Sequence, residues 1–362
     1  MARATPLHDV ILARIERDGP LTIEDYMGLC LGHPEYGYYR RADAIGVQGD
    51  FITAPEISQI FGEIVGAWAA TVWRAMGAPA PFSLVELGPG RGVLMADALR
   101  AAGRAPGFLG AARLHLVETS NRLRQEQQAR LREYAPVWTS SLAQVRPGPA
   151  IVIANEFFDA LPIRQFARAE GAWRERLVAA KGGALHIALG AALAPEDAAR
   201  FLLPAAAGDG EVCEVRPAIS EIMAQMARLA EGGALAALIF DYGHRGEGLG
   251  DTLQAVARHA FSDPLHAPGE TDLTAHVNFA ALASAAQRYG LTPHGPMPMG
   301  RFLLELGAAQ RLQALLAAAS EAQRERLISG FRRLTAPMEM GELFKTFALT
   351  AGLAEPPPPF RD

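Results

Sequence analysis

A glycine-rich turn constrains this chain more than any other sequence feature. Residues 85–92 read VELGPGRG, between an apolar stretch at 82–87 that predicts a short strand and a segment at 91–102 that predicts a helix. Because glycine has no Cβ, a ligand can approach the backbone of such a turn closely. Doubly wound α/β sheets bind their ligands beyond the carboxyl ends of the strands, where this turn is expected to lie.

The pattern around the turn predicts the fold class. We expect strands at 82–87, 113–118, 136–140, 150–154 and 234–241, and helices at 91–102, 121–133 and 218–229. The fourth strand is continuously apolar, as a parallel strand buried on both faces should be. This alternation predicts an α/β fold with a doubly wound parallel sheet. Further along, the pattern predicts a helix at 273–289, a broken helical stretch at 300–334 and a closing edge strand at 343–349.

Two segments lie outside the alternation. Residues 1–80 predict an N-terminal helical cover, in which Thr53 and Glu56 have the spacing of a capping box at the start of a long helix. Residues 163–215 predict an inserted β-rich subdomain, with antiparallel strands at 163–167, 172–179 and 184–189. The predicted domains are therefore the cover 1–80, a core of 81–162 and 216–352 with a helical insertion at about 300–335, the inserted subdomain 163–215, and a proline-rich tail 353–362.

Composition excludes several classes of protein. Half of the 362 residues are hydrophobic, which excludes disorder for most of the chain, and the net charge of −5 argues against a nucleic-acid binder. Two cysteines, Cys30 and Cys213, cannot build a disulfide framework, so we expect reduced, buried thiols. No apolar run is long enough to span a bilayer, and the first residues lack a signal-peptide pattern. These features predict a cytoplasmic protein without membrane insertion.

The acid before the turn bears on the choice of cofactor. Dinucleotide enzymes prefer Gly-x-Gly-x-x-Gly, with a pyrophosphate at the helix N-terminus. Here Gly88, Gly90 and Gly92 are spaced Gly-x-Gly-x-Gly around Pro89, and Glu86 precedes them. A carboxylate suits the ammonium group of S-adenosylmethionine and would repel a pyrophosphate. The turn therefore favours S-adenosylmethionine and leaves an NAD(P)-dependent oxidoreductase as an alternative.

The next two strands end in further candidate cofactor contacts. Glu118, followed by Thr119, ends the second strand, where an acid can bind both ribose hydroxyls. Ser141 and Leu142 follow the third strand, where we expect the adenine ring. The scattered histidines show no metal-binding spacing, so we predict no metal site.

The fourth strand runs into polar residues that fit methyl transfer. Residues 155–162 read NEFFDALP, so Asn155, Glu156 and Asp159 follow a buried strand. A guanidinium or amine nucleophile needs an acceptor that orients it and takes its proton, and carboxylates pair bidentately with a guanidinium. We expect Glu156 and Asp159 to be catalytic and Asn155 to contact the cofactor. The alternative is that one of these acids only caps a helix that follows.

With these segments in view, the chain resembles the MidA-like family of S-adenosylmethionine-dependent methyltransferases. The resemblance rests on HPEYGYY at 33–39, GDFITAPEIS at 49–58, ELGPGRG at 86–92, residues 155–162, DYG at 241–243 and DLTAHV at 272–277. It implies a class I methyltransferase (Rossmann-like) sheet with an N-terminal cover and an inserted subdomain. It also implies that residues 49–53 lie near the cofactor, with Asp50 and Thr53 as contacts.

The same resemblance implies a substrate class. Mitochondrial members of the family are complex I assembly factors that act as protein arginine methyltransferases. The expected activity is therefore methylation of a protein side chain, with arginine favoured and a respiratory complex I subunit as a possible partner. A different reading keeps the fold but makes the protein a non-catalytic assembly chaperone. Tyr242 could line the substrate pocket or pack in the core, and we expect His276 to be structural.

Overall fold

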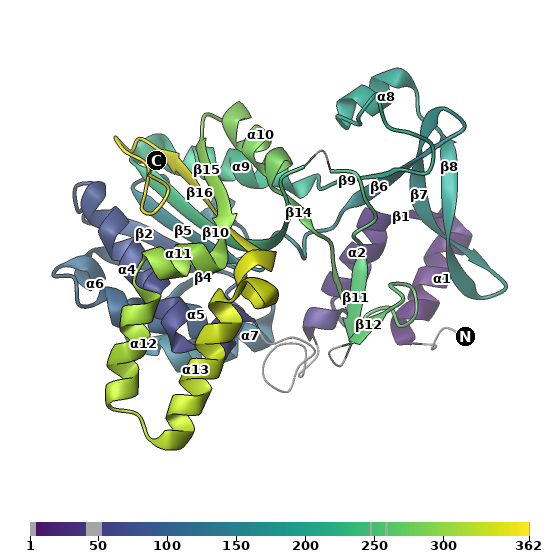
Figure 1. Ribbon diagram of the computed structural model, residues 1–362. Helices are drawn as coiled ribbons and strands as arrows, with labels where there is room; N and C mark the ends of the chain where they lie inside the picture. Colours follow the sequence, from purple (N-terminus) through teal and green to yellow (C-terminus); the bar gives the residue numbers. More distant parts are fainter. Residues whose placement is uncertain (1–4, 41–52, 247, 258–259, 362) are drawn as a thin grey trace. The chain divides into compact units, whose positions relative to one another are not determined.

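The computed structural model describes residues 5–40, 53–246, 248–257 and 260–361 (Figure 1). The chain divides into two compact units. Unit 1 comprises residues 1–51, 159–219 and 244–281, and unit 2 comprises 52–158, 220–243 and 282–362. The predicted glycine turn lies in unit 2. The domain bounds expected from the sequence stay a prediction.

Unit 2 is built on a twisted sheet of mostly parallel strands. Its main path runs in the order β15-β16-β10-β5-β2-β3-β4. The strands are β2 (Phe82–Leu87), β3 (Ala112–Val117), β4 (Val137–Thr139), β5 (Ala150–Asn155), β10 (Leu235–His244), β15 (Thr292–Pro298) and β16 (Phe344–Ala351). Neighbours from β10 to β4 are parallel. The predicted doubly wound sheet and its parallel strands are confirmed.

The edge of the sheet beyond β10 differs from the prediction. Strand β16 was expected to close the sheet, but it lies between β10 and β15 and pairs antiparallel with both. The sequence of β15, TPHGPMP, carries three prolines, and a proline cannot donate to a strand ladder. An edge strand tolerates them because one of its sides is unpaired, so the segment did not show the pattern of a strand.

The helices of unit 2 cover both faces of this sheet. Figure 1 shows α4 and α5 on one side and α9 and α10 on the other. The helices are α3 (Ala54–Ile57), α4 (Gln59–Ala75), α5 (Val93–Ala102), α6 (Phe108–Ala111), α7 (Asn121–Leu131), α9 (Ala218–Leu229), α10 (Phe279–Arg288), α11 (Met299–Glu305), α12 (Ala308–Ala317) and α13 (Glu321–Thr335). The broken helical stretch predicted at 300–334 is confirmed as α11 to α13.

Helices α4 and α5 approach each other closely, and this contact helps to position the glycine turn from which α5 begins. A Cβ added to Gly66 on α4 would lie 2.1 Å from the carbonyl oxygen of Ala98 on α5. The Phe61 ring of α4 packs edge-on against Phe240 of β10, with centroids 4.8 Å apart. The apolar face predicted for this helix is therefore the core face of unit 2.

Two helix boundaries differ from the prediction for local reasons. The long helix expected after Thr53 is broken at Ser58, whose backbone is extended. No capping box forms, because Pro55 has no N–H and the N–H of Glu56 donates to the main-chain oxygen of Thr53. The helix expected at 273–289 is wrong in its first turn and a half. Residues there form β13 (Asp272–Thr274) and β14 (Val277–Asn278), and the Asn278 side chain then caps α10 by accepting from Ala281 N–H at 3.0 Å.

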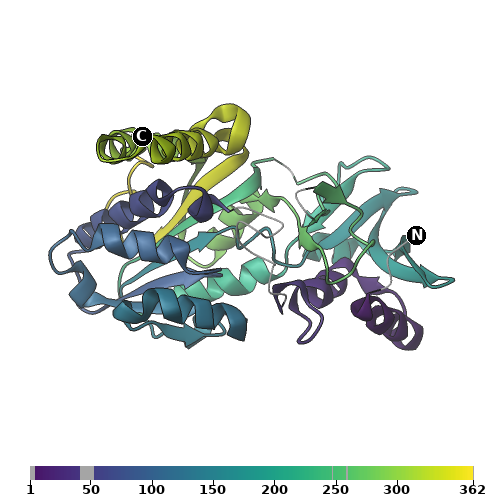
Figure 2. The same ribbon diagram turned by 90° about the horizontal axis from the view of Figure 1, so that it is seen from below.

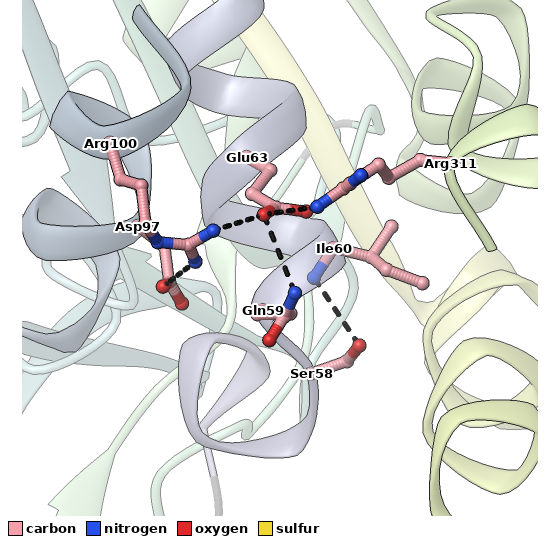
Figure 3. Close-up of polar contacts among 7 residues, drawn as sticks. All are labelled: Ser58, Gln59, Ile60, Glu63, Asp97, Arg100 and Arg311. Atoms are coloured by element: carbon pink, nitrogen blue, oxygen red, sulfur yellow. Dashed lines mark hydrogen bonds and ion pairs between the residues drawn. The ribbon is translucent and has the colours of Figure 1, made fainter. Parts of the chain in front are cut away.

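A buried ion-pair network ties the C-terminal helices to α4 and α5. Figure 2 shows the yellow-green α12 and α13 beside the dark-blue α4, and Figure 3 shows the side chains between them. Glu63 on α4 is 5 % exposed and accepts from Arg311 Nε at 2.6 Å and Nη2 at 2.8 Å. Arg100 on α5 also binds Glu63 and reaches Asp97. Burial alone would raise the pKa of Glu63, but the bonds from Arg311 and Arg100 outweigh it and lower the pKa.

Unit 1 contains the predicted antiparallel strands. Its larger sheet has the order β1-β7-β6-β9, with β8 paired to β7. The elements are α1 (Pro6–Asp18), β1 (Leu21–Thr22), α2 (Ile23–Gly32), β6 (Arg164–Ala169), β7 (Ala172–Lys181), β8 (Ala184–Ala192), α8 (Pro195–Arg200), β9 (Val212–Val215), and a small sheet of β11 (Gln254–Ala257), β12 (Ala260–Ser262) and β13. Cys30 and Cys213 are both buried and form no disulfide, as expected.

Among the described residues, no helix has both the length and the apolar character that a bilayer crossing requires. Within the same residues, no group of histidine, cysteine and acidic side chains is placed to hold a metal ion.

Candidate functional site

The glycine turn after β2 has the open geometry of a ligand cradle. Gly88, Gly90 and Gly92 have φ angles of 62°, 50° and 75°, a region that favours glycine. The turn is closed by a hydrogen bond from Gly92 N–H to Pro89 O at 2.8 Å. A Cβ at Gly88 would lie 3.0 Å from Phe157 Cδ2, whereas a Cβ at Gly90 would meet nothing within 4 Å. The space above Gly90 is therefore open to a ligand.

Glu86 is a buried carboxyl group beside this turn. It is 2 % exposed, and its Oε2 atom has no hydrogen-bond partner among the described residues. Burial, together with the nearby charge of Glu118, raises the pKa of Glu86 from its ordinary 4.5 to about 8. A cationic group on a ligand would offset both effects, so the surroundings of Glu86 favour a cation.

Glu118 follows β3 and is held by the loop after it. Its Oε1 accepts from Ser120 N–H at 2.7 Å, and its Oε2 accepts from the Gln127 side chain at 3.3 Å. Burial raises the pKa of Glu118, although these donors and Arg124 act in the opposite direction. The carboxylate is thus oriented before any ligand arrives. Thr119 beside it is exposed.

Gln127 is a site residue that the sequence analysis did not identify. The side chain is fully buried on α7 and donates to Gly90 O at 2.7 Å as well as to Glu118. Its Oε1 accepts from Trp138 Nε1 at 2.8 Å. The available signal was a glutamine in the buried stripe of α7, between Leu123 and Leu131 at intervals of four residues.

Glu156, after β5, is held in a strained backbone conformation. Its φ of 49° is uncommon for a residue with a side chain, and such strain concentrates at functional sites. Its Oε1 accepts from Ala54 N–H at 3.3 Å and from Asn155 Nδ2 at 3.1 Å. The structure therefore places Glu156 and Asn155 at the N-terminus of α3, directly after Thr53. The expected helix after residues 155–162 is wrong, since turns follow β5.

The turn at Glu156 is fixed by Asp241, which we did not assign a role from the sequence. Asp241 in β10 is fully buried, and its two oxygens accept from Phe158 N–H and Tyr242 N–H, each at 3.0 Å. The Tyr242 ring packs on Phe344 with centroids 5.4 Å apart and belongs to the core of unit 2. Core packing is therefore the better description of Tyr242.

The expected adenine contacts lie in unit 2 after β4. Ser141 Oγ donates to Gln225 Oε1 at 3.2 Å, and its backbone starts a short 3-10 turn. The Leu142 side chain is 2 % exposed and packs inward. Contacts of Ser141, Leu142 and Thr119 with adenine or ribose stay predictions.

Three other residues considered from the sequence, Asp159, His276 and Asp50, lie either in unit 1 or outside the described residues. Asp159 belongs to unit 1, where it is 4 % exposed and its carbonyl accepts from Ala275 N–H at 3.1 Å. His276 also belongs to unit 1, and its backbone N–H donates to Thr252 Oγ1 at 2.9 Å. Asp50, like residues 49–52 of the family motif, lies outside the described residues.

These features fit S-adenosylmethionine better than a dinucleotide. Beside the turn lies a buried carboxyl oxygen on Glu86 that has no hydrogen-bond partner among the described residues, and after β3 lies the oriented carboxylate of Glu118. An acid at Glu118 suits the ribose hydroxyls of either cofactor. An acid at Glu86 suits an ammonium and disfavours the negative charges of a pyrophosphate. That Glu86, Glu118 and the backbone of Gly88 to Gly90 hold the cofactor stays a prediction.

Comparisons with known proteins agree with S-adenosylmethionine as the cofactor. Residues 64–297 match the family described as "Putative S-adenosyl-L-methionine-dependent methyltransferase". Among curated relatives, the chain is 38 % identical to "Protein arginine methyltransferase NDUFAF7 homolog, mitochondrial" of Drosophila melanogaster, over 94 % of this chain and 84 % of the relative. It is 37 % identical to "Protein arginine methyltransferase NDUFAF7, mitochondrial" of Mus musculus, over 96 % of this chain and 85 % of the relative.

A solved structure with a bound ligand shares the fold. A crystal structure of a Burkholderia thailandensis protein bound to S-adenosyl-homocysteine superimposes with a TM-score of 0.83, at 28 % identity over 98 % of this chain and 96 % of that chain. The family match removes the oxidoreductase alternative. The chain belongs to this family of S-adenosyl-L-methionine-dependent methyltransferases.

Proposed function

We propose that the protein transfers a methyl group from S-adenosylmethionine to an arginine side chain of a protein. The observation that carries this proposal is Glu156, a carboxylate held at the carboxyl end of β5 with a strained φ of 49°. The relatives named protein arginine methyltransferases cover nearly the whole chain, which supports the same substrate class. Arginine is favoured because a carboxylate can bind two of its N–H groups at once.

The chemistry divides between the cofactor and the chain. S-adenosylmethionine, when bound, supplies an electrophilic methyl group on a sulfonium. Glu86 and Glu118 would hold its ammonium and ribose, and the glycine turn would let it approach the backbone. Glu156 would orient the guanidinium nitrogen and accept the proton that it loses. Asp159, the second acid of the motif at 155–162, is also proposed as catalytic, on the sequence motif alone.

The protein substrate we propose is a subunit of respiratory complex I, the partner of the mitochondrial members that the chain resembles. We also propose a cytoplasmic location for this protein. The net charge of −5 favours a basic protein segment over nucleic acid as the partner.

Labelled methyl transfer tests this proposal. The purified protein and radiolabelled S-adenosylmethionine are added to a lysate of a strain that lacks the gene, and the labelled residue is identified by mass spectrometry. We expect label on arginine of one protein, and much less with Glu156→Gln. Label on another residue type would contradict arginine as the acceptor. No transfer by folded, cofactor-binding protein would instead favour the assembly-chaperone reading.

A further inference from the structure

The side-chain amide of Gln127 makes three hydrogen bonds within one small region of unit 2. Its nitrogen has two N–H groups, and they reach Gly90 O at 2.7 Å and Glu118 Oε2 at 3.3 Å. Its oxygen accepts from the indole N–H of Trp138 at 2.8 Å. One side chain thus links the glycine turn, the acid after β3 and strand β4.

Because the Gln127 amide is buried, it destabilises the fold unless its hydrogen bonds are formed. Gln127 is 0 % exposed, and a buried amide is unfavourable unless it is hydrogen-bonded. Its neighbours on the same stripe of α7, Leu123 and Leu131, fill the equivalent positions with apolar side chains. A leucine at 127 would pack without any polar requirement. The amide therefore contributes something that packing alone does not need.

Gln127 also packs against the end of the glycine turn. A Cβ at Gly92 would lie 3.5 Å from Gln127 Cγ, so helix α7 and the end of the turn are in close contact. The bond to Gly90 O holds the one glycine of this turn at which an added Cβ would meet nothing within 4 Å.

We propose that Gln127 is a positioning residue for S-adenosylmethionine, which fixes the spacing between the glycine turn and the ribose-binding carboxylate of Glu118. Gln127 acts through Glu118 and Gly90. Its N–H keeps Oε2 of Glu118 oriented, while Ser120 N–H holds Oε1. The inference rests on the proposed function only through its cofactor.

The test is a double-mutant cycle read by calorimetric titration with S-adenosyl-homocysteine. We expect Gln127→Met to weaken binding by about tenfold, the usual worth of a hydrogen bond to a charged group. In a Glu118→Gln background, the same substitution should weaken binding at least threefold less, because the residue acts through that carboxylate. Gln128→Met is the matched control on the exposed side of α7 and should bind like the unchanged protein.

A pH profile separates positioning from a merely structural role. Loss of the Gln127 donor should move the lower-pH limit of binding upward by about half a pH unit or more, because Glu118 then holds its proton more firmly. The charged groups that interact with the Glu118 carboxylate beside Gln127 are Glu86 on β2 and Arg124 on α7. The proposal would be overturned if the pH profile of binding did not shift and the losses of affinity in Gln127→Met and Glu118→Gln were additive.

A second variant covers the case in which Gln127→Met does not fold. Trp138→Phe removes the indole N–H and keeps an aromatic ring, though a smaller one, and we expect a weakening of about threefold, in keeping with a neutral hydrogen bond. Unchanged affinity in this variant would count against the proposal. If Gln127→Met binds S-adenosyl-homocysteine more weakly but the methyl label lies on a residue other than arginine, the proposed function alone is contradicted. If Gln127→Met binds S-adenosyl-homocysteine as well as the unchanged protein and arginine is labelled, this inference alone is contradicted.

Discussion

The Oε1 atom of Glu156 accepts a hydrogen bond from the backbone N–H of Ala54 at 3.3 Å. This bond joins the end of strand β5 to the first residue of helix α3, two segments about a hundred residues apart in the chain. Ala54 of one family motif and Glu156 of the other therefore meet in unit 2, at the carboxyl edge of its sheet.

The first prediction concerns Glu156. Glu156→Gln keeps the size of the side chain but removes the proton acceptor, so kcat should fall by roughly a hundredfold, the usual contribution of a general base. The Kd for S-adenosyl-homocysteine should stay within about threefold, because the cofactor groups are unchanged. The measurement is labelled methyl transfer beside calorimetry.

Glu170→Gln is the matched control for Glu156→Gln. Glu170 is another glutamate with a positive φ, of 53°, but it is exposed in unit 1. Its substitution should leave kcat unchanged. Equal rates for Glu156→Gln and the unchanged protein would show that Glu156 only caps α3.

The second prediction concerns Glu86 and pH. Its pKa is raised by burial and by Glu118, so the folded state holds a proton that the unfolded state releases between pH 4.5 and about 8. This contribution to stability is present in full below pH 4.5 and is lost as the pH rises toward 8. Glu86→Gln should remove the loss, so the ligand-free variant should gain in melting temperature over the unchanged protein as the pH rises from 5 to 8.

The same substitution should carry a functional cost. Glu86→Gln removes the carboxylate that we propose as the partner of the cofactor ammonium, so affinity for S-adenosyl-homocysteine should fall by about tenfold or more. For the stability prediction, equal changes of melting temperature with pH in Glu86→Gln and in the unchanged protein would mean that Glu86 is not buried as a protonated acid.

The third prediction concerns the ion-pair network of Figure 3. Glu63→Gln leaves Arg311 and Arg100 without their shared carboxylate and should lower the free energy of unfolding by about 1–3 kcal/mol, discounted because both arginines are partly exposed. Since its folded pKa is lowered, the contribution of Glu63 is present above its ordinary 4.5 and is lost as the pH falls further. Thermal unfolding at pH 7 and pH 4 measures both effects.

A surface pair supplies the control for that measurement. Arg301 and Glu305 on α11 form an exposed pair four residues apart, and Arg301→Met should cost less than about 0.5 kcal/mol. If Glu63→Gln and Arg301→Met lowered the free energy of unfolding by similar amounts, the Glu63 network would stabilise the contact of α12 with α4 no more than an exposed surface pair does.

The sequence was sufficient for the features that depend on local pattern. The strands around the glycine turn are apolar and the turn itself needs residues with positive φ, so both could be read from residues 82–92. Gln127 and Asp241 could not be assigned in this way. Their roles depend on hydrogen bonds to residues 37 and 83 positions away, such as Gly90 and Phe158.

The errors in secondary structure have the same origin. Strand β15 is stabilised by pairing with β16, which outweighs its prolines because it lies at an edge. The helix expected from residue 273 begins at Phe279, because β13 pairs with β11 and Asn278 caps the helix. Tertiary pairing decided both segments against their local pattern.

The most direct test of the central claim is calorimetric titration of the full chain with S-adenosyl-homocysteine, beside Gly88→Val. We predict one binding site in the unchanged protein. In the variant we predict none, because a branched side chain at φ 62° would meet Phe157 and fill the turn. Circular dichroism should show that the variant keeps its fold. Absence of binding by the folded, unchanged protein, or equal binding by Gly88→Val, would contradict the assignment of this turn as the cofactor site.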